Sequence, residues 1–205
     1  MVALSAVATA LEKNDFKCQV FPNKKEAADW LLAQISPGDK VGFGGSVTLR
    51  QLDLPNRCRN LGAEVISHWE ASPEEKADLR ALFLRCFDAD FYLTSANAVT
   101  EEGYLFNVDG NGNRVAATIY GPRHVFFVVG KNKVVPNLAA AETRLGQEAS
   151  PRNNQRLDAP NPCRDTGRCC DCRSPHRSCR VYTVMKRAPF LTDITVLLID
   201  EELGY

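Results

Sequence analysis

Apolar and polar positions along the chain recur with two periods, one typical of amphipathic helices and the other of short buried strands. Apolar residues return every three or four positions in three segments, which predicts helices over 3–14, 23–35 and 72–87. Asn23 is a suitable N-cap for the second helix, and Ser72 begins a capping box with Glu75 in the third. The inner face of that third helix is expected to hold Leu79, Leu82, Phe83 and Cys86. Further helices are expected to open at "SVTLRQLDL" and to span 138–146.

Short apolar runs between these helices predict the strands of a buried sheet. They are "VGFGG", "FYLTSANAV", "VFFVVG", "VYTVMK" and "ITVLLID". The run "VFFVVG" over 125–130 is apolar throughout, as expected of a strand in the middle of a sheet that is covered on both faces. A hairpin is expected to join 104–108 to 114–118, because "DGNG" is typical of tight turns. The sequence thus predicts an α/β fold with a mainly parallel sheet flanked by helices, a hairpin, and a cysteine-rich loop at 160–181.

Length and charge restrict the function classes. A chain of 205 residues, 44% of them apolar, can form its own core, and we expect one domain over 1–205. The 25 basic residues balance 25 acidic ones, so no overall field attracts nucleic acid or an anionic membrane. The first residues lack the basic region of a secretion signal, and no segment holds eighteen apolar residues in a row. We therefore expect a cytoplasmic protein, with neither nucleic acid nor membrane as a partner.

Five of the eight cysteines lie close together near the end of the chain. Cys163, Cys169, Cys172 and Cys179 have the spacing C-x5-C-x2-C-x6-C, and Cys170 is an additional thiol inside it. In a reduced compartment, clustered thiols indicate metal binding rather than disulfides. Four thiolates suit either a closed zinc site or an iron–sulfur cluster of the [4Fe–4S] type, and the residues alone leave both open.

A glycine-rich turn, "GFGGSVT", follows one predicted strand and precedes a helix. Glycines allow backbone N–H groups to converge on an anion, so Gly44, Gly45, Ser46 and Thr48 are candidate ligands of a phosphate or carboxylate. A plain tight turn explains the same glycines, because the turn lacks the lysine of a P-loop and the spacing of a dinucleotide-binding motif.

Polar residues also gather after the strand that begins at Phe91. Asn97, Asn107 and Asn113 are candidate substrate-binding residues, and Glu101 is the candidate catalytic base. Asn97 and Glu101 follow directly on a buried strand, where α/β proteins usually place their ligands. Tight turns use the same residue types, which is the better explanation of 109–112.

Several longer segments resemble the lactate-utilisation (LUD) domain family. They are "VGFGGSVTLRQL", "YLTSANAVTEEGYLFNVDGNGNRVAATIYGPRHVFFVVGKNKVV" and "PRNNQRL", while "NPCRDTGRCCDCRSPHRSCR" resembles the family's small cysteine-bearing branch from anaerobes. The resemblance covers the chain from about Lys13 onwards. It implies a fold similar to that of ribose-5-phosphate isomerase, glucosamine-6-phosphate deaminase and coenzyme A transferases, in which the loop matching 44–48 binds phosphate or substrate. Some members of the family take part in oxidising lactate to pyruvate alongside iron–sulfur subunits, whereas this chain carries its own cysteine cluster.

Two functions from different classes follow from these observations. In the first, the protein is a redox component or enzyme in the utilisation of lactate or a related small organic acid. Its four cysteines hold an iron–sulfur cluster, a small anionic ligand binds the glycine-rich turn, and an electron-transfer protein is its partner. In the second, zinc stabilises a ligand-binding or regulatory module, or an isomerase-like enzyme that acts on a sugar phosphate or a coenzyme A thioester. The content of iron, sulfide and zinc distinguishes the two.

Overall fold

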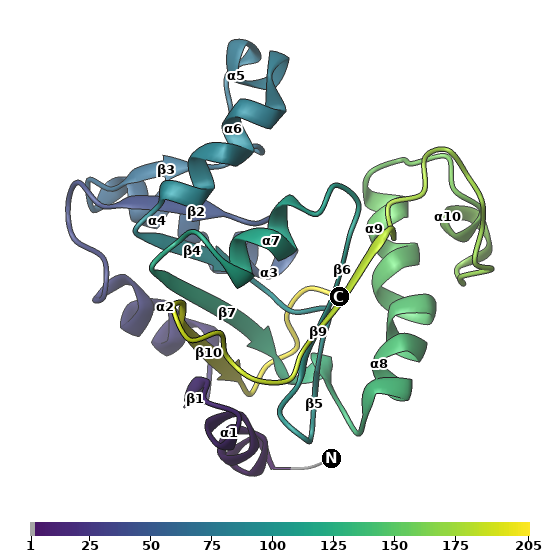
Figure 1. Cartoon of the computed structure of the whole chain (residues 1–205), viewed down its shortest axis with the longest axis horizontal. Coiled ribbons are helices and arrows are strands. Elements are labelled where there is room, and N and C mark those ends of the chain that lie inside the picture. Colours follow the sequence, from purple (N-terminus) through teal and green to yellow (C-terminus); the bar gives the residue numbers. More distant parts are fainter. Residues whose placement is uncertain (1–2) are drawn as a thin grey trace.

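An all-parallel sheet of six strands forms the centre of the computed structural model, which describes residues 3–205 (Figure 1). The first two residues of the expected domain lie outside the described residues. The strand order is β1-β10-β7-β4-β2-β3. These strands are β1 (Lys17–Phe21), β2 (Lys40–Phe43), β3 (Glu64–Ile66), β4 (Phe91–Thr94), β7 (His124–Gly130) and β10 (Asp193–Ile199). The expected α/β fold with a mainly parallel sheet is confirmed.

Strand β7 occupies the middle of this sheet, as its apolar run predicts. It pairs in parallel with β10 on one side and with β4 on the other. Its side chains alternate between two hydrophobic clusters: Val125, Phe127 and Val129 pack in one, and Phe126 and Val128 in the other. Both faces of the strand are therefore buried.

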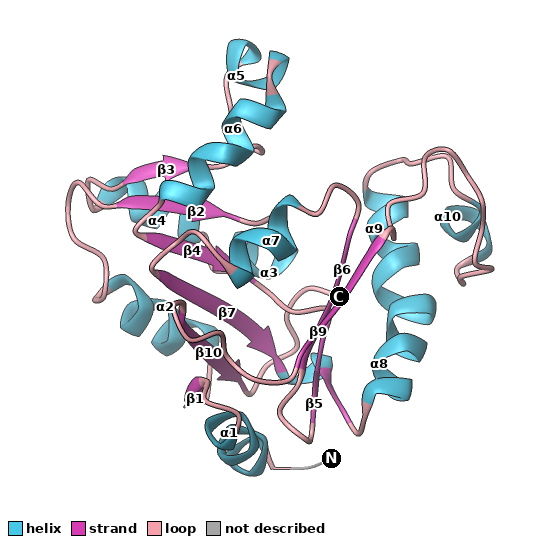
Figure 2. Cartoon of the chain, viewed as in Figure 1, coloured by secondary structure: helices cyan, strands magenta, loops and turns pink. Residues whose placement is uncertain are grey.

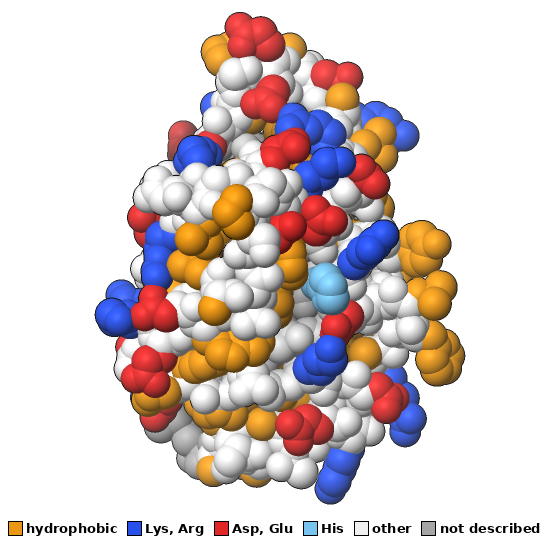
Figure 3. Space-filling view, turned by 90° about the vertical axis from the view of Figure 1, so that its left-hand side faces the viewer, with side chains coloured by type: hydrophobic (Ala, Val, Ile, Leu, Met, Phe, Trp, Pro, Cys, Tyr) orange, Lys and Arg blue, Asp and Glu red, His pale blue; other side chains and the backbone are white. Residues whose placement is uncertain are grey.

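Helices cover both faces of the sheet (Figure 2). One face is covered by α1 (Leu4–Lys13), α6 (Leu79–Arg85) and α7 (Asn113–Ile119). The other is covered by α2 (Lys24–Leu32), α3 (Val47–Gln51) and α4 (Leu54–Asn60). On the surface drawn in Figure 3, basic and acidic side chains are interspersed, in keeping with the balanced charge of the chain.

The predicted helix caps are present, but the third helix is interrupted. Asn23 Oδ1 accepts the N–H of Glu26, and Ser72 and Glu75 form the capping box. The helix that they begin, α5 (Pro73–Ala77), then stops, because the Asp78 side chain accepts the N–H of Ala81 and caps the new helix α6. The break changes which residues face inward. Leu82 and Cys86 are buried as expected, whereas Phe83 is half-buried and Leu79 is exposed, so the predicted inner face is wrong at Leu79.

A second, four-stranded sheet stands beside the first. Its order is β8 (Val134–Val135), β5 (Ala98–Thr100), β6 (Leu105–Asp109) and β9 (Val181–Met185). The first strand of the predicted hairpin is present as β6. The prediction of a second strand over 114–118 is wrong, because 113–119 forms helix α7. The reason is Asp109, whose Oδ2 accepts the N–H groups of Arg114 and Val115 at 2.9 and 3.2 Å and so begins a helix. The antiparallel hairpin of this sheet is instead β5 with β6.

Between β8 and the cysteine-rich loop, the chain is mostly helical. Helix α8 (Leu138–Arg144) continues through a π-helical segment, η3 (Leu145–Ala149), into α9 (Ser150–Arg156), so the predicted helix extends beyond 146. The loop itself contains the short helix α10 (Pro162–Thr166) and returns to the sheet at β9. Shorter 3-10 segments are η1 (Cys86–Asp88) and η2 (Lys131–Lys133). Across residues 3–205, no helix has the length and apolar character needed to cross a bilayer.

Gly103 in the β5–β6 turn packs against the backbone of α1. Its φ is +79°, and a Cβ there would lie 2.5 Å from the carbonyl carbon of Ala10. Gly103→Ala is expected to lower the free energy of unfolding, measured by urea denaturation, by about 2–4 kcal/mol. Gly38→Ala is the matched control, because Gly38 has φ +88° but no atom within 4 Å of the added Cβ. Equal losses in the two variants would contradict the assigned contact.

Candidate functional site

A cavity of about 300 Å³ opens at the carboxyl ends of the central parallel strands. One wall comes from the segments that follow β2, β3, β4 and β7. They contribute Gly45–Val47, His68 and Trp69, Ser95–Asn97, and Lys133. The opposite wall comes from the end of β6, the start of α7, the segments η3 and α9, and the end of the cysteine-rich loop. Ligand sites of open α/β sheets are usually found at this place.

Lys133 is the most unusual residue of this cavity. Its side chain is buried, with 3% of the residue exposed, and its Nζ donates to Thr48 Oγ1 and Ser95 Oγ at 2.9 Å each. It forms no ion pair with an acidic side chain in the described part of the chain. Burial, with smaller effects from the charges of Arg144 and Arg114, lowers the pKa of Lys133 to about 7. A buried amine near half-protonation therefore sits in the wall of the cavity.

Arg114 adds a fixed positive charge at the start of α7. Its guanidinium donates to Asn107 Oδ1 at 2.8 Å and to Asn97 Oδ1 at 3.1 Å. It also donates to the backbone carbonyls of Ser95 and Val108. Asn97 lines the cavity, whereas Asn107 is buried behind it. These two asparagines hold Arg114, so their amide oxygens are already engaged within the protein.

The glycine-rich turn forms another part of the same wall. Gly45 and Ser46 line the cavity, and the backbone amides of 45–47 donate no hydrogen bond to another described residue. Ser46 Oγ accepts the N–H of Leu49 and so caps α3. Gly44 lies behind the wall, where a Cβ would come within 2.7 Å of Thr94 Oγ1. Thr48 is fully buried and reaches the cavity through its bond with the amine of Lys133, so the turn offers free amides beside that amine.

The remaining charged and aromatic groups make the cavity cationic. Arg156 lies over the ring of Trp69 at 5.6 Å and donates from Nε to the hydroxyl of Tyr205. Burial, then the charge of Arg156, lowers the pKa of His68, which keeps its imidazole neutral at pH 7. Asp109 is the acidic residue of the described lining, and its carboxylate is taken up by backbone amides. The cavity therefore favours an anionic ligand.

The cysteine-rich loop contributes Cys179 to the lining. Cys163 and Cys179 are buried, Cys172 is half-buried and Cys169 is exposed. Burial raises the pKa of the Cys163 thiol, and the charges of Cys179, Cys169 and Cys172 raise it further. Each of the three other expected ligands thus lies near enough to Cys163 to affect its titration, although they are spread over residues 163–179 of the chain.

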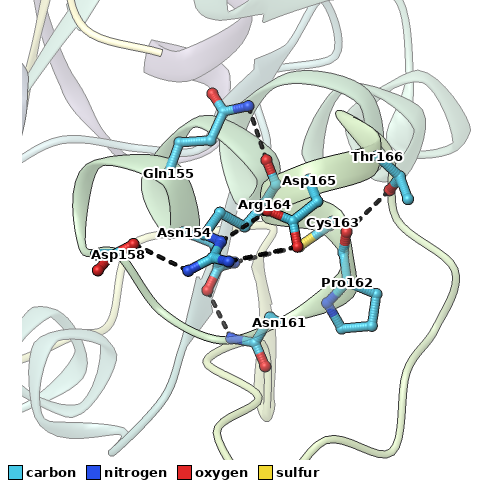
Figure 4. Close-up of polar contacts among 9 residues, drawn as sticks. All are labelled: Asn154, Gln155, Asp158, Asn161, Pro162, Cys163, Arg164, Asp165 and Thr166. Carbon is cyan, nitrogen blue, oxygen red and sulfur yellow. Dashed lines mark hydrogen bonds and ion pairs between the residues drawn. The ribbon is translucent and has the colours of Figure 1, made fainter.

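A buried amide network supports this loop at Cys163 (Figure 4). Asn154 in α9 donates from Nδ2 to Cys163 Sγ at 3.4 Å. Asn161 donates to Asn154 Oδ1 at 2.7 Å and to the carbonyl of His176 at 3.0 Å, while its own buried Oδ1 has no partner among the described residues. Arg177 donates to the carbonyls of Cys172 and Cys179 and so links the middle of the loop to its last part.

The thiols of the loop have the donor chemistry of a zinc or iron–sulfur site, but they do not close around an ion. No group of three or more His, Cys, Asp or Glu side chains within 3–205 is arranged to hold a metal ion. The metal site at Cys163, Cys169, Cys172 and Cys179 therefore stays a prediction. Cys170 is exposed and is not one of the thiols that raise the pKa of Cys163.

A family model described as the LUD domain matches residues 4–199. The chain belongs to the LUD domain family. This membership indicates a function related to lactate utilisation, in agreement with the resemblance of its motifs.

Similarity to a solved structure of a DUF162 family protein supports the fold of this LUD domain. A DUF162 family protein from Deinococcus radiodurans has a TM-score of 0.54 at 12% identity, over 96% of this chain and 95% of that one. The beta subunit of eIF2B from Chaetomium thermophilum has a TM-score of 0.38 at 18% identity, over 56% of this chain and 43% of that one. Translation initiation factor eIF-2B from Pyrococcus horikoshii OT3 has a TM-score of 0.35 at 20% identity, over 56% and 48%. No curated protein matches the chain.

The predicted site residues of the LUD domain are only partly brought together. Gly45, Ser46, Asn97 and Asn113 line one cavity with Cys179. Glu101 does not line it. Glu101 lies half-buried in the turn after β5, at a separate surface hollow that Lys131 and Asp200 also line. Its assignment as a catalytic base stays a prediction, but the structure separates it from the residues with which the sequence grouped it.

The central residue that sequence reasoning missed is Lys133. A signal was present in "GKNKVV", which directly follows the apolar strand β7, since ligands of parallel sheets bind at carboxyl strand ends. His68, Trp69 and Arg156 were missed as well. They come from segments far apart in sequence, and only the fold places them together.

Proposed function

We propose that this LUD domain binds lactate or a related small organic acid and takes part in its oxidation as a redox component with an iron–sulfur centre. One observation carries the proposal: Lys133 and Cys179 line the same cavity. An anion site and the predicted electron-accepting site are therefore neighbours, although neither set of residues is close to the other in sequence.

The amine of Lys133 is a suitable partner for a carboxylate. A buried cation without a counter-ion is unfavourable, and an arriving anion relieves that cost and raises the pKa of the amine again. The free amides of 45–47 and the side chain of Arg156 surround the same space. Its volume of about 300 Å³ suits a small metabolite.

His68 is the best general base in the cavity. Its lowered pKa leaves the imidazole neutral, and a neutral imidazole can accept the proton of a substrate hydroxyl. The acidic lining residue Asp109 cannot do this readily, because its carboxylate already accepts three backbone amides. We therefore assign His68 to proton transfer and Lys133 to binding the carboxylate.

The iron–sulfur centre would be held by Cys163, Cys169, Cys172 and Cys179. If bound, such a cluster would supply one-electron chemistry, so the two electrons lost by a 2-hydroxy acid would have to leave one after the other to an electron-transfer protein. The N–H of Asn154 that points at Cys163 Sγ would stabilise a thiolate at that position. Five arginines of the segment would offset the negative charge of four thiolates. They are Arg164, Arg168, Arg173, Arg177 and Arg180.

Calorimetry with lactate and pyruvate tests the anion site. Both acids are expected to bind the wild-type protein, and Lys133→Met is expected to weaken binding at least about tenfold, since a charged hydrogen bond contributes roughly 1.5–3 kcal/mol. Lys131→Met is the matched control, because Lys131 is half-buried and pairs with Asp200 at 3.0 Å, outside the cavity.

Calorimetry with other classes of ligand can contradict the proposed function. If a sugar phosphate or a coenzyme A thioester binds and the two organic acids do not, the isomerase-like alternative replaces this proposal. Unchanged lactate affinity in Lys133→Met would remove Lys133 from the site.

A further inference from the structure

The hydrogen bonds of Lys133 suit a neutral amine as well as a charged one. A neutral amine has two N–H groups, and the structure supplies two acceptors at 2.9 Å, Thr48 Oγ1 and Ser95 Oγ. Each hydroxyl also has a carbonyl to which it can donate its own hydrogen, that of Leu203 at 3.3 Å for Thr48 and that of Ala96 at 3.5 Å for Ser95. They are therefore oriented to accept from the amine, which leaves its lone pair as the group without a partner.

The surroundings of Lys133 keep that lone pair available. No carboxylate pairs with the amine in the described residues, and the neighbouring charges, Arg144 and Arg114, are positive and favour the neutral form. Lys131 provides the contrast two residues earlier, since it is only half-buried and is paired with Asp200. A nucleophilic lysine is typically one that is desolvated and adjacent to other cations.

We propose that Lys133 forms an imine with the carbonyl carbon of a 2-oxo acid bound in the cavity. This inference rests on the proposed function, because a 2-oxo acid is the oxidised form of the 2-hydroxy acid assigned to the same site. It adds a covalent step and a substrate class, the 2-oxo acids, to simple binding of an anion.

The step balances without any oxidant or reductant. Nζ adds to the carbonyl carbon, and the carbon–oxygen double bond becomes a single bond in a carbinolamine. The proton lost by Nζ passes to that oxygen, and the Ser95 hydroxyl, 2.9 Å from Nζ, is placed to relay it. The remaining proton of Nζ then passes to the same oxygen, which leaves as water, and a carbon–nitrogen double bond remains. In this step Arg156 and the free amides of 45–47 hold the carboxylate, so that the amine of Lys133 stays neutral and attacks the neighbouring carbonyl carbon.

Reductive trapping tests the imine on the wild-type full-length protein. Pyruvate and sodium cyanoborohydride are added, and the modified lysine is located by peptide mass mapping. The expected result is one reduced adduct at Lys133, at least about tenfold more abundant than at Lys131, which serves as an internal control. Lactate has no carbonyl carbon and is expected to give no adduct, and its addition is expected to suppress the adduct formed by pyruvate.

The outcomes separate the imine from the proposed function. No adduct, or equal labelling of Lys131 and Lys133, overturns the imine. If pyruvate and lactate nevertheless bind by calorimetry, the proposed anion site stands without it. If neither acid binds and no adduct forms, both proposals fail. Since the assay uses the unaltered protein, it does not depend on whether a Lys133 variant folds.

Discussion

Lys133→Met is expected to change how the stability of the protein depends on pH. Relative to the variant, the wild type is expected to gain roughly 3–4 kcal/mol in the free energy of unfolding between pH 7 and pH 10. The cause is the pKa of Lys133, which burial lowers from 10.5 to about 7 in the folded protein. Methionine has a similar length and no charge to bury.

The sign follows from proton counts in the two states. Between pH 7 and 10 the unfolded chain keeps a proton on Lys133 that the folded protein has already lost. Stability rises with pH wherever the unfolded state binds more protons, here by at most about 1.4 kcal/mol per pH unit. Below pH 6 both states are protonated, so the difference between wild type and variant is constant. The hydrogen bonds of Lys133 to Thr48 and Ser95 add a constant to the difference in the free energy of unfolding between wild type and variant. They do not change the slope of that difference with pH.

Urea denaturation at intervals from pH 6 to pH 10 measures this effect. Lys131→Met is the control, because Lys131 is half-buried and pairs with Asp200 outside the cavity, and the curve of this variant is expected to run parallel to that of the wild type. Parallel curves for Lys133→Met would show that the amine keeps its proton in the folded protein. A saturating carboxylate ligand is expected to move the transition to higher pH, since it stabilises the charged amine.

The sheet and its flanking helices were predictable because their signals are local. The run at 125–130 is apolar on both faces, and only a central strand requires that. The capping box at Ser72 and Glu75 likewise needs no tertiary contact. Local signals failed where the same side chain is common in two kinds of local structure. Asp109 is as suitable for a tight turn as for a helix start, and its bonds to the amides of Arg114 and Val115 settle the choice in favour of a helix.

The site was less predictable, because its chemistry depends on burial. A lysine is usually expected on the surface, and nothing in the amino-acid sequence shows that Lys133 is buried beside two hydroxyls. Pairing of β9 with β6 brings the end of the cysteine-rich loop to the cavity, so the position of Cys179 also follows from the tertiary fold. The spacing of the cysteines could predict a set of metal ligands, but it could not predict that this set lies beside the cavity of Lys133.

Cys163→Ser and Cys179→Ser are each expected to abolish binding of iron and sulfide. Protein purified without air is expected to contain about four iron and four sulfide per chain, with broad visible absorbance. These two thiols are the buried members of the proposed set, and Cys163 is the thiol whose pKa the other three raise. Loss of either leaves three thiolates for a cluster that normally has four ligands.

Cys170→Ser is the matched control for the two cluster variants. Cys170 is adjacent to Cys169 but exposed, and it lies outside the proposed ligand set, so this variant is expected to retain iron, sulfide and colour. Equal loss of iron in Cys170→Ser would show that the ligand set is wrong. One zinc per wild-type chain without sulfide would instead make the loop a structural site and leave the cavity without an adjacent electron acceptor.

Bleaching of the visible absorbance by lactate tests whether the anion site and the cluster act together. If the bleaching is retained in Cys170→Ser and lost in Lys133→Met, the two sites serve one function.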